Sequence, residues 1–517
     1  MIGTSHLRET TEWVDRANVA RDLEALLRPT KRGRPRQLSV RTLLIGIKRS
    51  IDTAKTACLT DVHRLLVEQL HHRDQAELGV VNRRTGELIS LHQVRRLFVT
   101  LTARLDPSGH PTPALPDGAC ATRHEALQSV LDRLLDATMT TDVTHHGSYA
   151  IDGTGVWSWS RGKRRTELSA DPDARWGTKT HKSGKQESYF GYEVHALVRI
   201  NSQRQDRADV PCLAERIIVA PASTNCVNAV LPALRKLQAD TDNVREIVAD
   251  RGYTYKTNWG PELYALGVQP VLDLHATQYG AHGTHEGARI ITGVPHCPAT
   301  PPGLDTIKRP DRLADGPDVD AFIDQISRRE QWAFRRITSA DAGGKERFEC
   351  PARAGKVRCA LFKPSMAKPF ALPTVSHPPA DHPPRCCSQR TITVPGDVDP
   401  KSRQHHYWGS RDWITAFSRR SRVEGMVRQP QKQQHREPDA WRLPRHGHRQ
   451  NQPHARHLRR CNQPPAPPRL DGPTTARGRS HRFEPGHEAE ASSPAQRSAT
   501  STSKSTTGLA EQTSKPD

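Results

Sequence analysis

Residues 148–160, SYAIDGTGVWSWS, decide the fold. Before this point the apolar residues recur at helical intervals, and here the spacing changes to that of a β-strand. Asp152 follows two apolar residues, and Gly153 and Gly155 come after it. We expect the strand to leave the hydrophobic core at the acid and to end or kink at the glycines.

The strand pattern returns several times downstream. Two further predicted strands cover 189–200 and 214–222, in which apolar side chains alternate or run together. A helix, a strand that ends at Asp250, a short helix and a last strand are then predicted at 226–239, 244–250, 260–267 and 268–274. Three strands followed by helix, strand, helix and strand predict an α/β fold around one mixed sheet.

Residues 1–107 predict a helical region, which we expect to bind DNA. Apolar stripes at helical spacing begin near Val40, Val62 and Val94. The basic run KRGRPR at 31–36 precedes the first stripe, and extended peptides of this type lie in the narrow, negative minor groove of DNA. Its candidate DNA-binding residues are Arg32, Arg34 and Arg36. A solvated basic linker is the alternative, and 108–140 reads as a linker rich in Pro and Gly followed by one more helix.

The charge balance favours a polyanionic partner. Of the 517 residues, 77 are Lys or Arg and 56 are Asp or Glu, which gives a formal net charge of +21. A positive field of this kind attracts nucleic acid, so double-stranded DNA is the expected partner. Lys179 and Lys182 belong to a predicted basic loop between the first two strands, which can grip phosphates. A solvated run of charges explains this loop equally well.

No stretch of the sequence predicts a membrane span or a secretory leader. The first residues lack an apolar segment behind a basic end, and no run of about 18 apolar residues occurs. We therefore expect a soluble cytoplasmic protein, associated with the nucleoid through DNA and without a membrane partner. The 10 cysteines are then thiols or metal ligands rather than a secreted disulfide framework.

Four cysteines lie in a predicted insertion subdomain, 276–400, which is rich in Gly, Pro and His and has a long periodic element only near 319–337. Cys350, Cys359, Cys386 and Cys387 can hold a structural Zn²⁺ in tetrahedral geometry. Their spacing is not the compact pairing of a zinc ribbon, so buried thiols are the alternative.

Three acids are candidate metal ligands. Asp152 and Asp250 each lie where a hydrophobic strand leaves the core, and the first and fourth strands of a mixed sheet can be neighbours. Carboxylate oxygens are the ligands that Mg²⁺ prefers. On a predicted helix at 411–425, Arg420 and Glu424 share one face, where they can meet phosphate and metal respectively. Taken singly, a turn-forming acid or an exposed ion pair explains each of these residues.

As a set, the three acids resemble the DDE transposases of bacterial insertion sequences. One group of these enzymes carries Tyr-x2-Arg-x3-Glu-x6-Lys on the last helix of the core. This chain has Phe417 in place of the Tyr, Arg420 and Glu424 in register, and Gln431 in place of the Lys. The resemblance spans roughly 30–425 and includes the stretches ARWG, YFGYEVHAL and CCSQRTITVPGD.

The resemblance implies a ribonuclease-H-like catalytic core, its first part at 141–275 and its catalytic helix at 401–425. It implies that Asp152, Asp250 and Glu424 hold two Mg²⁺ or Mn²⁺ ions and that Arg420 binds phosphate. It also implies a homodimer on DNA. The expected function is cutting and joining of DNA at the ends of an insertion sequence. A structure-selective nuclease with the same acids and a noncatalytic basic DNA-binding protein are the alternatives.

The segment 426–517 does not resemble a protein core. It contains no Ile or Tyr, a single Val and twelve Pro. Dropping the first nucleotide of the Met426 codon opens a frame in which MVRQPQKQQHREPDAW can become WFGNLKNNSTENLTRG, with a lysine where Gln431 stands. We interpret the tail as disordered and frameshifted, which makes the activity of this chain doubtful because Glu424 loses packing beyond it. A natural basic tail that binds DNA is the alternative.

Overall fold

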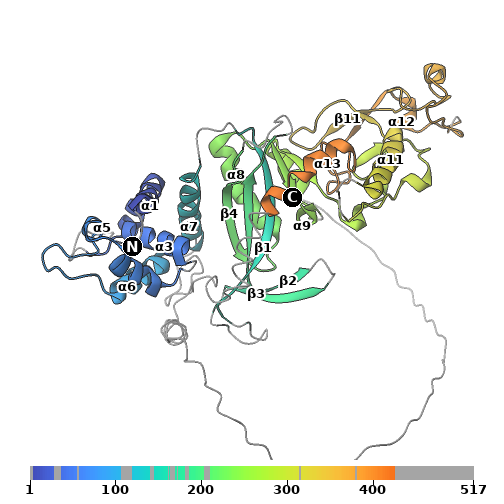
Figure 1. The fold of residues 1–517 in the computed structure, drawn as a ribbon. Helices are drawn as coiled ribbons and strands as arrows, with labels where there is room; N and C mark the ends of the chain where they lie inside the picture. Colours follow the sequence, from blue (N-terminus) through green and yellow to red (C-terminus); the bar gives the residue numbers. More distant parts are fainter. Residues whose placement is uncertain are drawn as a thin grey trace, which may run out of the picture. The chain divides into compact units, whose positions relative to one another are not determined.

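The computed structural model describes residues 4–424 with gaps, and the description that follows is limited to them (Figure 1). The gaps are 28–35, 55–56, 106–118, 140–144, 161, 163–168, 170, 172, 181–184, 203–209, 255, 312, 314–315 and 379–380. Arg32, Arg34, Lys182 and the tail 426–517, which the sequence predicts to be disordered, lie outside the described residues.

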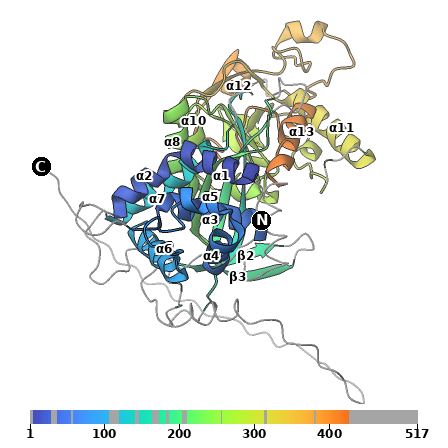
Figure 2. The same ribbon diagram turned by 60° about the vertical axis from the view of Figure 1, so that its left-hand side comes forward.

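The N-terminal part of the described chain is helical, and the blue helices gather into one bundle in Figure 2. The apolar faces of these helices share one buried cluster, which includes Val14, Leu43 and Val94. The helices are α1 (Thr4–Ala17), α2 (Val19–Leu27), α3 (Val40–Ala54), α4 (Leu59–Arg64), a π-helical turn at Leu65–Gln69, α5 (His72–Glu77) and α6 (Leu91–Leu105).

Helix α7 (Ala119–Asp136) connects this bundle to the sheet by ion pairs, of which Arg216 and Asp132 are buried. Arg216 of strand β4 lies 3.6 Å from Asp132 and 2.8 Å from Asp136. Lys236 of helix α8 lies 2.9 Å from the second oxygen of Asp132. The indole N–H of Trp13 also donates to the carbonyl of Leu134, so α7 contacts both α1 and the sheet.

One mixed sheet forms the centre of the fold, in the order β2-β3-β1-β5-β6, with β4 also paired to β3. β1 is antiparallel to β3 and parallel to β5, and β5 is parallel to β6. Residues 194–198 of β3 pair with both β1 and β4, so β4 lies on the edge of β3 that faces away from β1. The strands are β1 (Ser148–Trp157), β2 (Arg175–Thr180), β3 (Gln186–Arg199), β4 (Ala214–Pro221), β5 (Glu246–Ala249) and β6 (Gln269–Leu272).

Two local predictions about this sheet are wrong. β1 does not end or kink at its glycines but stays paired with β3 as far as Trp157. The glycines instead make room for neighbours, because a Cβ on Gly155 would lie 2.6 Å from the Tyr189 ring. The predicted basic loop is in part strand β2, which places Lys179 opposite Glu187 in a ladder.

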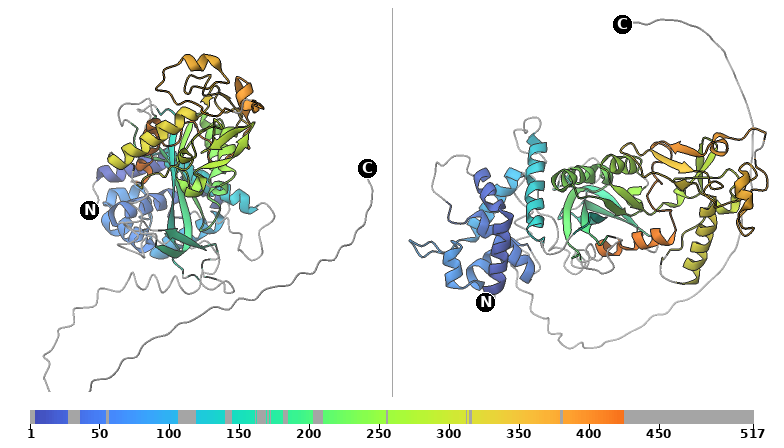
Figure 3. Two further views of the ribbon diagram at one scale, coloured as in Figure 1. Left: turned by 90° about the vertical axis from the view of Figure 1, so that its right-hand side faces the viewer. Right: turned by 90° about the horizontal axis from the view of Figure 1, so that it is seen from above.

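Alternating side chains divide the sheet into two buried faces. Tyr149, Ile151 and Ala249 face helix α8 (Cys226–Thr241), whose first turn is capped by the Asn225 side chain. Ala150 and Val248 face the opposite way, toward helix α13 (Arg411–Ser418). Figure 3 shows α8 and the orange α13 on opposite sides of the strands. Helices α9 (Arg251–Thr254) and α10 (Trp259–Ala265) connect β5 to β6.

The insertion is more regular than the sequence predicts. It holds two three-stranded antiparallel sheets, β7-β8-β9 and β10-β11-β12. Strands of two to five residues are too short to show a period in the sequence, whereas the long α11 (Pro317–Trp332) falls where the one long periodic element is expected. The other elements are β7 (Ala281–His285), β8 (Ala288–Ile291), β9 (Val294–His296), β10 (Arg335–Arg336), β11 (Glu346–Glu349), α12 (Arg385–Ser388) and β12 (Thr391–Val394).

Helix α13 is anchored to the sheet through Trp413. This side chain is fully buried, stacks on Phe417 at 5.0 Å between ring centroids, and donates its indole N–H to the carbonyl of Leu272 at 3.0 Å. The Ser410 hydroxyl caps the helix start by accepting from the backbone N–H of Trp413. α13 ends at Ser418 rather than 425, and a separate helical turn at 421–424 follows.

None of the described helices has both the length and the apolar character needed to cross a membrane.

Replacing Trp413 by Ala is expected to lower the free energy of unfolding by about 3–5 kcal/mol, because the substitution leaves a cavity and removes one of the two side-chain hydrogen bonds to the Leu272 carbonyl, the other coming from Gln404. Chemical denaturation followed by the fluorescence of the remaining tryptophans measures the change. The control is Phe370→Ala, since Phe370 is 87% exposed and contacts Arg358 only as a surface cation–π pair worth about 1 kcal/mol at most. Equal effects of the two substitutions would contradict the anchoring role of Trp413.

Candidate active site

Two carboxylates meet where β1 and β5 stop pairing. In the parallel ladder Ile151 is opposite Ala249, so the next residue along each strand is an aspartate, Asp152 or Asp250. The three residues of each strand before the aspartates are buried, Tyr149–Ile151 in β1 and Ile247–Ala249 in β5. By alternation from Ala150 and Val248, the two aspartates project on the side of the sheet that α13 covers. The predicted convergence of the first and fourth strands is therefore present.

The environment of the pair favours protonation. Burial, followed by the nearby charge of Asp250, raises the pKa of Asp152 from 3.8 to about 6. Burial also raises the pKa of Asp250, and the Arg420 guanidinium opposes this rise. Each carboxylate accepts one backbone N–H, from Gly153 at 3.0 Å and from Gly252 at 2.8 Å. Two like charges with limited access to water are costly, so the site favours a compensating cation.

Arg420 supplies the nearest positive charge. Its guanidinium lies 3.6 Å from an oxygen of Asp152 and donates to the Glu424 carboxylate at 2.6 Å. Glu424 in turn contributes to the raised pKa of Asp152. The three candidate acids and Arg420 thus belong to one electrostatic group.

The turn that carries Glu424 is packed, whereas the sequence analysis expects Glu424 to lie at a helix end that loses its packing. Val423 is fully buried, and the Arg422 guanidinium donates to the carbonyl of Val210 at 3.0 Å. One turn earlier, Arg419 forms a 2.8 Å ion pair with Glu246 at the start of β5. These contacts join the end of the described chain to the start of β5 and to the segment before β4.

Glu193 is an acid near this group that the sequence reasoning did not single out. Burial and the charge of Asp250 raise the pKa of Glu193, and Lys256 lowers it. Glu193 is paired with Gly155, and it projects on the face opposite Asp152. Glu193 and His195 each lie opposite a glycine of β1, a pairing that the sequence alone does not reveal.

His195, for which the sequence left a DNA contact and a core histidine open, is a core residue. It is fully buried, and its Nδ1 shares a 2.8 Å hydrogen bond with the Tyr253 hydroxyl. Burial lowers the pKa of His195 to about 4, so the ring is neutral at physiological pH. A Cβ on Gly153 would lie 3.0 Å from His195 Nδ1, which explains why the residue after Asp152 is glycine.

The other predicted site residues that the structure describes belong to elements that do not carry the acids. Arg36 forms an ion pair with Glu24 of α2. Lys179 lies on strand β2. The four cysteines of the predicted zinc set are free thiols of the insertion.

The donor chemistry of Asp152, Asp250 and Glu424 fits a hard divalent cation, because all three offer carboxylate oxygens. The raised pKa values of Asp152 and Asp250 show that a cation would relieve their repulsion. In the described part of the chain, no group of three or more His, Cys, Asp or Glu side chains is already arranged to hold a metal ion. The Arg420–Glu424 ion pair is consistent with this result, since it holds the third carboxylate in a salt bridge.

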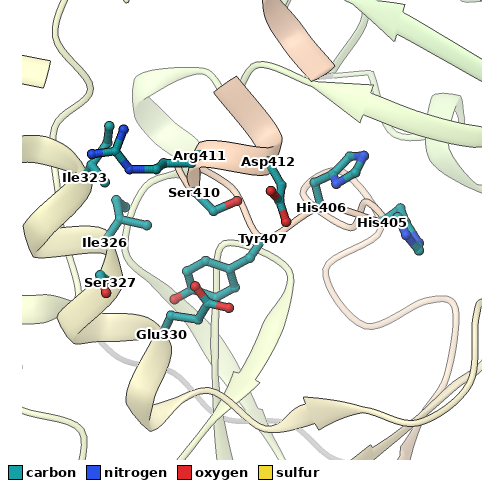
Figure 4. Close-up of a pocket in the computed structure, with 10 residues that line it drawn as sticks. All are labelled: Ile323, Ile326, Ser327, Glu330, His405, His406, Tyr407, Ser410, Arg411 and Asp412. Carbon is teal, nitrogen blue, oxygen red and sulfur yellow. The ribbon is translucent and has the colours of Figure 1, made fainter. Parts of the chain in front are cut away.

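A pocket elsewhere on the described surface is not this site. It lies between α11 and the start of α13, and Figure 4 shows its ten lining residues, among them Glu330, His405, His406 and Asp412. None of those ten is Asp152, Asp250 or Glu424. The acids therefore lie outside this pocket.

No family model, no curated protein and no solved structure compared with the chain matches it. The assignment of the site therefore depends on the geometry described above and on the resemblance of its motifs.

The raised pKa of Asp152 predicts a pH-dependent stability. Because the folded protein holds this proton up to about pH 6 and the unfolded chain only to about 3.8, the free energy of unfolding falls as pH rises through this window. The contribution is about 3 kcal/mol at 1.36 kcal/mol per pH unit. Metal-free Asp152→Asn is therefore expected to be more stable than the unmodified chain at pH 7.5, with the difference disappearing near pH 4.

Thermal unfolding with a chelator present, recorded at several pH values, measures this difference. Asp324→Asn is the control, because Asp324 lies on the exposed face of α11 and pairs with Arg328. A difference that does not change between pH 4 and 7.5 would contradict the burial and repulsion assigned to Asp152.

Proposed function

We propose that the chain is a transposase of the DDE type, which cuts and joins DNA at the ends of an insertion sequence. The observation that carries the proposal is the convergence of Asp152 and Asp250 at adjacent ends of β1 and β5, with Arg420 and Glu424 on the helical turn beside them.

The strand order supports the finer assignment of a ribonuclease-H-like core. The central five strands run β4-β3-β1-β5-β6, and only β3 opposes the direction of the others. Helix α8 connects β4 to β5 across one face of the sheet. The insertion of β7 to β12 then separates β6 from α13, so the chain returns to the sheet to deliver the third acid.

Each charged residue has a role in phosphodiester chemistry. Asp152, Asp250 and Glu424 would hold Mg²⁺ or Mn²⁺. When bound, such ions activate water or a 3′-hydroxyl and stabilise the leaving oxygen. Arg420 would bind the DNA phosphate. Its planar guanidinium can exchange its contact with the Glu424 carboxylate for two parallel hydrogen bonds to phosphate oxygens. Burial of the site strengthens these interactions by limiting access of water.

The proposed partners are double-stranded DNA and a second copy of the chain, and the proposed location is the cytoplasm at the nucleoid. The net charge of +21 supports DNA binding. The composition of residues 426–517 supports a shifted reading frame, which would reduce or abolish the activity of this chain. The restored frame places a lysine seven residues after Glu424, on the same helical face.

The test compares four proteins on a supercoiled plasmid that carries the coding region and its flanking sequence. The frame-restored chain is expected to nick this DNA and join the ends to a target when Mg²⁺ is present. Asp152→Asn and Asp250→Asn are each expected to reduce both products by more than about 100-fold, because each removes a metal ligand and leaves the other carboxylates in place. Asp324→Asn is the matched control and is expected to keep both activities.

Nicking without joined products would favour the nuclease alternative over the transposase. Binding of DNA without nicking, unchanged by Asp152→Asn and Asp250→Asn, would favour the noncatalytic DNA-binding protein. If the gene shows no single-base deletion near codon 426 that opens the second frame, the frameshift interpretation is wrong.

A further inference from the structure

We propose that the insertion binds one structural Zn²⁺ through Cys297, Cys350, Cys359 and Cys387. This set replaces Cys386 of the sequence-based set with Cys297, which lies far upstream of the other three. The site is separate from the three acids, and its test is independent of the transposase proposal.

The four thiols come from four segments that meet in the insertion. Cys297 follows β9, Cys350 follows β11, Cys359 lies in the next loop, and Cys387 belongs to α12. Cys297 and Cys359 are buried in one hydrophobic cluster, and Cys350 packs against it. Cys350 and Cys387 also pack together against a second cluster. Each of the four thiols is close enough to the other three to interact electrostatically.

Three of these cysteines begin turns whose backbone amides point at the sulfur. Ala299 N–H donates to the Cys297 sulfur, the N–H groups of Ala352 and Arg353 to the Cys350 sulfur, and those of Leu361 and Phe362 to the Cys359 sulfur.

Turn hydrogen bonds hold two of these loops, from Thr300 N–H to the Cys297 carbonyl and from Phe362 N–H to the Cys359 carbonyl, both at 3.0 Å. Amide donors of this kind stabilise a thiolate, the form of cysteine that binds zinc, more than they stabilise a neutral buried thiol.

Cys387 fits the set better than its neighbour Cys386. Cys386 is fully buried in a hydrophobic cluster with Phe348 and Ile392, and its N–H donates to the carbonyl of Glu286. Cys387 is partly exposed and interacts electrostatically with Cys297, Cys350 and Cys359. Cys386 therefore has the surroundings of a core residue and Cys387 those of a ligand.

A zinc ion explains how this part of the chain holds together. Its two sheets have strands of two to five residues, and its hydrophobic clusters are small. Small cores of this kind are commonly supplemented by a structural metal. Without the ion the sulfurs are not arranged for coordination, which needs Zn–S distances of about 2.3 Å. Binding therefore requires the four side chains to rotate inward and to release their protons.

The experiment measures metal content and thiol protection in the full-length chain. Chain produced with zinc and dialysed is expected to retain one equivalent by elemental analysis. Cobalt substitution is expected to give the absorption bands of a tetrahedral site with four sulfur ligands. Cys297→Ala is expected to lose the metal, whereas the matched Cys386→Ala is expected to keep one equivalent.

A second measurement avoids any variant that fails to fold. In the unmodified chain, zinc is expected to slow alkylation of Cys297, Cys350, Cys359 and Cys387 by at least 10-fold, with peptide mass spectrometry before and after chelation as the readout. Cys58, in the N-terminal helices, is the internal control and is expected to react equally in both states. Absence of bound metal, or a full equivalent retained by Cys297→Ala, would overturn the proposal, as would alkylation rates that chelation does not change.

Discussion

The parallel pairing of β1 and β5 is the constraint on which the rest of the structure depends. Both strands are covered on both faces, by α8 on one side and by α13 on the other, so the paired residues after Ser148 and Glu246 contribute to the two hydrophobic clusters. Pairing ends with Ile151 opposite Ala249. The next residue of each strand therefore appears at the same edge, and in this chain both are aspartates.

Placing two carboxylates together at the edge of a core destabilises the metal-free fold. The raised pKa values of Asp152 and Asp250 are the electrostatic expression of that cost. Arg420 offsets part of it, and the contacts of Arg419, Arg422 and Val423 fix the turn that carries Arg420 and Glu424. Groups with strongly shifted pKa values that the fold keeps together despite their repulsion are typical of functional sites, which reduce local stability.

Much of the sheet was predictable because its strands are apolar and long enough to show their period. Asp152, Asp250, Arg420 and Glu424 were found from strand ends and helical spacing, which are local properties of the sequence. β2 was read as a loop because its residues, RWGTKT, are mainly polar and lie at the sheet edge. Glu193 and Cys297 were missed because their partners come from distant segments, and only the fold brings these together.

The most direct test of the central claim is to map where a divalent ion binds. Fe²⁺ replaces Mg²⁺ at carboxylate sites, and with ascorbate and peroxide it releases hydroxyl radicals that cut the backbone next to the bound ion. The account predicts cuts beside Asp152, Asp250 and Glu424, suppressed by excess Mg²⁺ and absent in the Asp152→Asn, Asp250→Asn double variant. Cuts confined to other segments, such as the pocket beside His405 and Asp412, or cuts unchanged in the double variant, would contradict it.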